Sequence, residues 1–134
     1  MKFVFLFFAS WLAGLTAYLG SGMMLYHQQI GRGDLIAVAF WSLLAFAAAF
    51  GVLYLPALFA LRHRLRGVRP AWAFPVVAVL LGIVPVVLII SFFGGWSLRD
   101  LARPEALLFY CMFGGVGLVV GFGFAYIYRH DHAA

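Results

Sequence analysis

The sequence predicts an all-α integral membrane protein whose four transmembrane helices form an up-and-down bundle with short loops. Of its 134 residues, 66% are hydrophobic and 10% are charged, whereas soluble proteins contain about 25% charged residues. The charged residues leave four long runs free of Asp, Glu, Lys and Arg, at 3–31, 35–61, 70–98 and 106–128. Each run exceeds the about 20 residues that cross a bilayer as a helix. We therefore predict a single domain, 1–134, with spans at about 4–26, 35–60, 73–93 and 106–128.

The first span follows directly on Met1 and Lys2, so it also has the outline of a secretory signal peptide. Signal peptides carry an apolar region of about 7 to 15 residues. Here the apolar run continues to Tyr26. We therefore expect a retained first helix, with cleavage as the alternative.

The second span is bounded by residues typical of helix ends. Asp34 precedes the apolar run, and its carboxylate is expected to cap free N–H groups of the second helix. Pro56 is expected to mark the last turns of this span, because proline disrupts the interior of a helix.

The third span contains a proline near its middle and a tryptophan near each end. Pro85 lacks a backbone N–H, so a bend is expected near residues 81 to 85. The bend could serve packing or act as a gate, and we favour packing. Trp72 and Trp96 are expected at headgroup level, where indole rings collect.

The fourth span is preceded by helix-start signals. Ser97 and Asp100 are spaced as in a capping box, which predicts a short turn on the membrane surface. Pro104 and Glu105 suit the first turn of the fourth helix, where proline loses no hydrogen bond and a negative charge meets the positive helix end.

The distribution of basic residues predicts the orientation in the membrane. Four spans place both termini and the loop 62–72 on one side. That side holds Lys2, Arg62, Arg64, Arg66, Arg69 and Arg129, and the other holds Arg32, Arg99 and Arg103. Because Lys and Arg concentrate in cytoplasmic loops, we expect both termini in the cytoplasm.

Small residues recur at helical spacing and predict where the helices approach one another. The fourth span presents Gly114, Gly117 and Gly121 on one face, and the first presents Gly14 and Ala17. Small residues allow close backbone approach, which drives association in lipid. The second span is too rich in alanine for such a face to be specific. Packing within the bundle and against a second copy remain alternatives.

The composition argues against several kinds of chemistry. All four acids, Asp34, Asp100, Glu105 and Asp131, lie at loops or helix ends, whereas ion-coupled transporters usually need a carboxylate at bilayer depth. The single cysteine, Cys111, rules out an intramolecular disulfide and a cysteine zinc site. The basic residues lie in short turns that offer no extended surface to nucleic acid. We expect no enzymatic activity, no cofactor and no nucleic-acid partner.

The histidines are the candidate ligands for a metal ion or a haem iron. His27 lies at the outer end of the first span, away from the others. His130, Asp131 and His132, with or without His63, have the ligand types of a metal site. Neighbouring arginines and a short chain end favour a solvated tail, so we predict no metal.

The densest charge cluster is Arg62, Arg64, Arg66 and Arg69. It is sufficient as an orientation signal. It also suits contact with phospholipid headgroups or an acidic cytoplasmic partner.

These features lead to two functional hypotheses. The first is a small non-catalytic accessory subunit, assembly factor or scaffold of a membrane complex, expected in a bacterial cytoplasmic (inner) membrane. Its partners would be lipids and helices of other membrane proteins or of its own copies. The alternative is a small homo-oligomeric channel or carrier for a neutral, anionic or lipidic solute, with a lipid or quinone enzyme as a weaker third.

Overall fold

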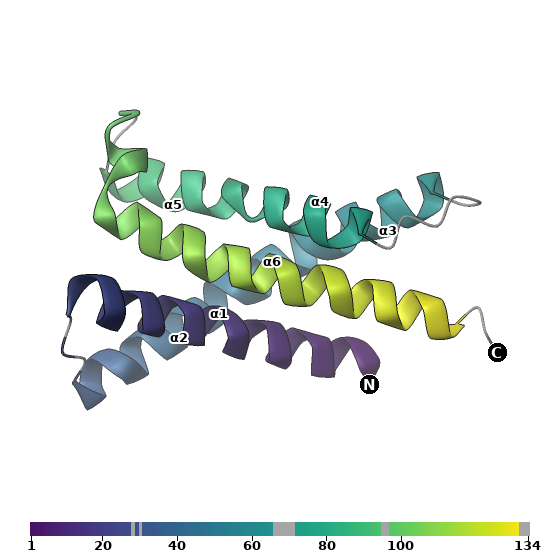
Figure 1. Ribbon diagram of the computed structural model, residues 1–134, viewed down its shortest axis with the longest axis horizontal. Coiled ribbons are helices and arrows are strands. Elements are labelled where there is room, and N and C mark those ends of the chain that lie inside the picture. The colour runs from purple at the N-terminus through teal and green to yellow at the C-terminus, as the bar shows by residue number, and fades with distance from the viewer. Residues whose placement is uncertain (28, 30, 66–71, 95–96, 132–134) are drawn as a thin grey trace.

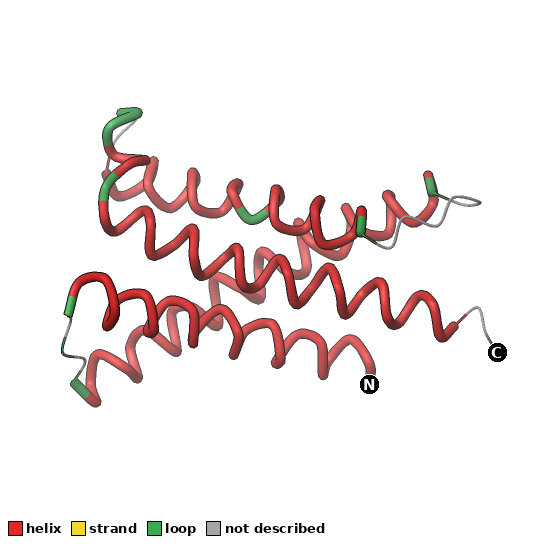
Figure 2. The backbone as a smooth tube through the Cα atoms, viewed as in Figure 1, coloured by secondary structure: helices red, strands yellow, loops and turns green. Residues whose placement is uncertain are grey.

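The computed structural model describes residues 1–27, 29, 31–65, 72–94 and 97–131, and within these ranges the chain is helical almost throughout, without a strand (Figures 1 and 2). The elements are α1 (Lys2–Tyr26), α2 (Arg32–Ala49), the π-helix η1 (Phe50–Tyr54), α3 (Leu55–Arg64), α4 (Ala73–Leu81), α5 (Ile83–Gly94), the 3₁₀ turn η2 (Asp100–Ala102) and α6 (Pro104–Asp131). The chain is an all-α four-helix membrane protein, as predicted.

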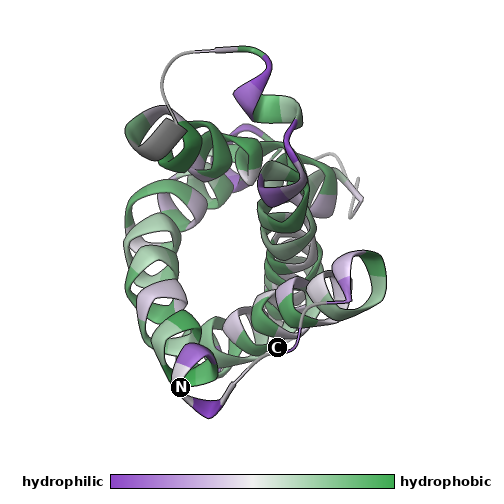
Figure 3. Cartoon of the chain, turned by 90° about the vertical axis from the view of Figure 1, so that its left-hand side faces the viewer, coloured by the Kyte–Doolittle hydropathy of each residue, from purple (hydrophilic) through white to green (hydrophobic). Residues whose placement is uncertain are grey.

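Among the described residues, four helical stretches are long and apolar enough to cross a membrane. They are Lys2–Tyr26, Arg32–Arg64, Ala73–Phe92 and Pro104–Arg129. Each contains one predicted span almost entirely, and Figure 3 shows hydrophobic colouring along the helices with hydrophilic residues gathered at their ends. Hydropathy alone therefore located the spans.

The fourth span lies at the centre of the bundle. Figure 1 shows α6 between α1 on one side and α4 with α5 on the other, while α2 and α3 cross behind at an oblique angle. The most apolar stretch of the fourth span is 44% buried, against 17% in the first. The start of α1 and the end of α6 lie at the same end of the molecule (Figure 1).

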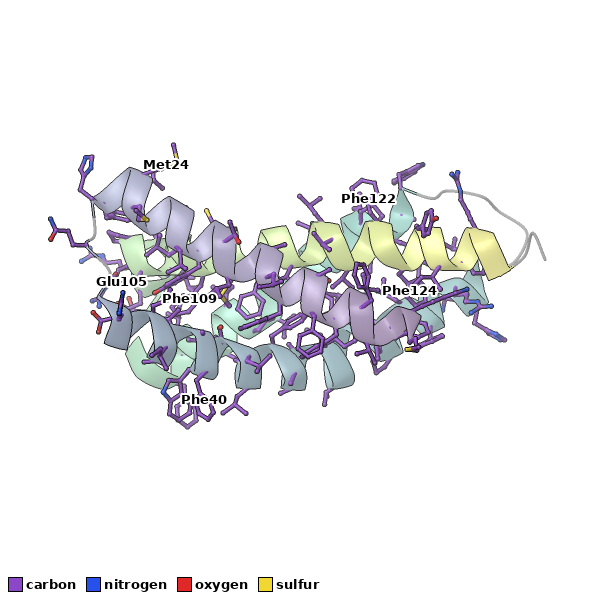
Figure 4. All side chains as sticks on the ribbon, turned by 90° about the horizontal axis from the view of Figure 1, so that it is seen from below. Met24, Phe40, Glu105, Phe109, Phe122 and Phe124 are labelled. Carbon is purple, nitrogen blue, oxygen red and sulfur yellow. The ribbon has the colours of Figure 1, made fainter. Side chains whose placement is uncertain are left out.

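The buried core is aromatic towards the end where α1 begins. Phe7 of α1 stacks on Phe46 of α2, with ring centroids 5.0 Å apart. Phe124 of α6 packs against Phe74 of α4 and Phe59 of α3. Figure 4 shows Phe124 pointing between the helices, where these rings join all four spans.

The second span contains a π-helix immediately before Pro56. The ring of a proline clashes with the carbonyl four residues earlier in a regular helix. Here the wider η1 turn precedes it, and the Leu55 N–H donates to the Phe50 carbonyl. The helix then continues as α3 to Arg64. Pro56 thus lies more than two turns before the end of the span.

The third span is interrupted where a bend was predicted. α4 ends at Leu81 and α5 begins at Ile83. The Gly82 N–H donates to the carbonyls of both Ala78 and Val79, as in a tightened turn. The interruption at Gly82 falls within the predicted interval and one turn before Pro85.

The helix starts differ in one respect from the prediction. α2 begins at Arg32 with Gly31 as its N-cap, and no side chain caps it. The predicted Asp34 cap is therefore wrong, because the helix starts earlier and places Asp34 inside the first turn. Its charge still lies near the positive helix end.

The predicted turn before the fourth helix is present as η2. Ser97 Oγ accepts a hydrogen bond from the Arg99 N–H at 3.2 Å. Asp100 forms a 2.8 Å ion pair with Arg103. α6 then begins at Pro104, with Glu105 in its first turn, as expected.

Of the two tryptophans that flank the third span, Trp72 is exposed just before α4, and Trp96 lies outside the described residues.

Candidate functional site

Two predicted glycines of α6 lie against the backbone of α4. A Cβ built on Gly117 would be 2.8 Å from the Ala78 carbonyl oxygen. One built on Gly121 would be 2.6 Å from the Pro75 nitrogen. Backbone atoms cannot move aside as a flexible side chain can, so these positions require glycine.

The first helix approaches the opposite side of α6. A Cβ on Gly14 would overlap Val116, and the Cβ of Ala17 lies 3.3 Å from the Cβ position of Gly115. Gly114, which was expected on the packing face, has open space at its Cβ position. The predicted residues Gly14, Ala17, Gly117 and Gly121 are thus at helix contacts, and Gly115 takes the place of Gly114.

The arginine cluster is only partly described. Arg62 stacks over the ring of Tyr128 with its guanidinium carbon 4.8 Å from the ring centroid, so it ties α3 to α6. Arg64 is exposed at the end of α3, while Arg66 and Arg69 lie outside the described residues.

The remaining candidate ligands do not gather in the described part of the chain. There, no three His, Cys, Asp or Glu side chains come close enough to hold one metal ion. His27 ends α1 in a left-handed conformation, and Cys111 is half-buried in α6. The side chain of His130, and His132 altogether, lie outside what the structure describes.

A polar contact inside the bundle joins the first two spans. The Trp11 indole N–H donates to Ser42 Oγ at 3.1 Å, and Ser42 in turn donates to the Ala39 carbonyl. Trp11 lies three residues from Gly14, the middle of α1, which is about 4.5 Å along the helix. This contact therefore lies near the middle of α1 and within the apolar part of both spans.

The neighbouring residue, Trp41, faces away from the bundle at the same depth. Its side chain is 68% exposed and packs edge-on against Phe40, with ring centroids 5.7 Å apart. Figure 4 shows Phe40 pointing away from the other helices. Within the described ranges, no hydrogen-bond acceptor reaches the Trp41 indole N–H.

We define the aromatic face of α2 as Ile36, Phe40, Trp41 and Leu44, all of which are exposed. The first part of α2, residues 32–37, is exposed on every side. Its close contacts with other helices are chiefly with α1, and Figure 1 shows it diverging from α5 and α6. Residues 32–37, at the start of this span, are thus left largely uncovered by other helices within the described chain.

This face was not predicted above, although the sequence contains a signal for it. Tryptophans in membrane proteins collect at the two interfaces. Trp41 instead lies within an apolar run, six residues past Leu35. An indole N–H in such a run needs an acceptor; Trp11 finds one in Ser42, whereas Trp41 has none within the described chain.

Comparison of the chain with protein families, with curated proteins and with solved structures found no match.

Proposed function

We propose that this integral membrane protein is a non-catalytic accessory subunit, assembly factor or scaffold of a membrane complex, and that the aromatic face of α2 binds a helix of another membrane protein. The observation that carries the proposal is the 68% exposed Trp41 side chain within the apolar second span, whose indole N–H has no hydrogen-bond acceptor in the described chain. Lipid chains offer no acceptor at this depth.

An unpaired N–H group in an apolar environment costs about 1 to 3 kcal/mol. A partner helix with a hydroxyl, an amide or an under-bonded carbonyl would remove this cost. The Phe40 and Trp41 rings would add a large contact area that is already ordered by their mutual packing. Aromatic side chains of this kind often dominate binding energy at interfaces.

The distribution of polar groups supports a role without chemistry. Asp34, Asp100 and Glu105 lie at the helix starts or in the turn before α6. We place the protein in a bacterial cytoplasmic membrane with the Arg62 end of the bundle inside, following the distribution of Lys and Arg.

The test is site-specific photocrosslinking in the native membrane. A photoreactive phenylalanine analogue at Phe40 is expected to form an adduct with one foreign membrane protein. The matched control carries the analogue at Leu88, which is 63% exposed on α5, and is expected to label lipid. Adducts from both positions, or from neither, would contradict the proposal.

The variant Trp41→Phe removes the indole N–H but keeps an aromatic ring, so it tests the hydrogen bond separately from the ring contact. We expect this variant to keep its fold and to bind the partner protein with an about tenfold higher dissociation constant, the effect of losing a single hydrogen bond. Crosslinking of Phe40 only to a second copy of this chain would overturn the accessory role and would favour the homo-oligomeric channel or carrier.

A further inference from the structure

A long open groove runs along the surface of α6 in the half of the bundle where α1 begins. It has a volume of about 1490 Å³ and is lined by α1, α6 and Trp72. Its floor is an exposed stripe of α6, composed of Leu118, Phe122, Tyr126 and Arg129. Figure 4 shows Phe122 pointing outward, on the opposite side of α6 from the core residue Phe124.

The groove is apolar along its length and basic at one end. Phe5 and Ala9 of α1 form one wall of the groove. Below this wall, the side chain of Leu6 in α1 packs against Gly123 of α6. Lys2 and Arg129 both line the groove at one end, where α1 starts and α6 nears its end. An occupant that combines apolar chains with an anionic group matches both parts of this lining.

The length of the groove matches one leaflet of a bilayer. From Leu118 to Arg129 the stripe extends about 16 Å along the helix. Half of a hydrocarbon core is about 15 Å thick. A transmembrane helix of a partner would need a path across both leaflets, so a lipid fits this groove better.

We propose that this groove binds an anionic phospholipid of the leaflet on this side, independently of the proposed function. The acyl chains lie along Phe5 and Phe122, and the phosphate lies between Lys2 and Arg129. Trp72, which is 68% exposed at the groove, is placed at headgroup level, as interfacial tryptophans are.

The test is native mass spectrometry of the detergent-solubilised full chain, titrated with phosphatidylglycerol or phosphatidylcholine. The wild type is expected to bind phosphatidylglycerol about thirtyfold more tightly, the effect of two basic residues near a lipid phosphate. The Lys2→Ala/Arg129→Ala variant is expected to lose this preference. Arg32→Ala/Arg99→Ala, which removes the same charge at the other end of the bundle, is expected to keep it.

A groove-filling variant tests the apolar part separately. Ala9→Phe is expected to reduce binding of both lipids, because the new ring occupies the space of the acyl chains. Equal preference in the wild type, or equal loss in both charge variants, would overturn the proposal.

A second measurement keeps the test valid if a variant does not fold. Phosphatidylglycerol with a photoreactive acyl chain is added to the wild type, and the adducts are mapped by peptide mass spectrometry. Adducts at Phe5 or Phe122 support the groove, and adducts spread evenly over the exposed helix surfaces contradict it.

Discussion

At the scale of single residues, the close contacts between helices depend on positions where a side chain has no room. Gly121→Ala places a methyl group against the Pro75 backbone of α4. We expect this variant to be destabilised by about 1 to 3 kcal/mol, the usual cost of overpacking. Gly114→Ala adds the same methyl group in open space and should change stability by less than about 0.5 kcal/mol. Unfolding in mixed micelles by a denaturing detergent compares the two, and equal losses would contradict this account.

The Trp11 to Ser42 hydrogen bond allows a second test at this scale. Trp11→Phe and Ser42→Ala each remove one partner of the 3.1 Å bond. Interhelical hydrogen bonds in membrane proteins contribute about 0.6 kcal/mol on average. We expect a coupling energy of about this size in a double-mutant cycle of unfolding free energies. Strict additivity of the two single losses would show that the bond does not stabilise the bundle.

The sequence did not show which of the adjacent residues Gly114 and Gly115 contacts a neighbouring helix. Adjacent glycines differ by about 100° around a helix, so the run Gly114-Gly115-Val116-Gly117 is compatible with more than one packing face. The prediction of Gly114 follows if each helix presents a single face of small residues. α6 instead lies between two neighbours and uses Gly115 towards α1 and Gly117 towards α4. Only the arrangement of the helices could reveal this.

At the scale of elements, hydropathy predicted each span but could not predict the π-helix. The Phe50–Tyr54 turn contains one extra residue relative to a regular helix, and an extra apolar residue does not change the apolar character of the run. The interruption at Gly82 was predictable, because Pro85 supplies a definite steric and hydrogen-bonding cause. Pro85 thus indicated the break in the third span, whereas Pro56 did not reveal that the second span would continue through a wider turn.

The π-helix leads to a prediction about deletion. Gly51 is exposed, and no atom lies near its Cβ position. In a Pro56→Ala background, deleting Gly51 should convert the wide turn into regular helix and keep the faces of α2 and α3 in register. Deleting Ala45 from the regular part of α2 should instead rotate the preceding residues by about 100° and separate Trp11 from Ser42. Size-exclusion chromatography and thermal unfolding in mild detergent measure the difference, and similar behaviour of the two deletions would argue against this reading of η1.

At the scale of the whole molecule, the topology and the charge distribution together predict an orientation. The start of α1 and the end of α6 lie at one end of the bundle (Figure 1), and six of the nine Lys and Arg residues belong to that side of the sequence. Because positively charged loops are retained in the cytoplasm, Ser97 at the opposite end should face outward. In a Cys111→Ser background, a membrane-impermeant maleimide should label Ser97→Cys in intact bacterial cells and label His63→Cys only after permeabilisation. The reverse pattern would invert the assigned topology, and it would place the lipid groove in the outer leaflet while leaving the fold unchanged.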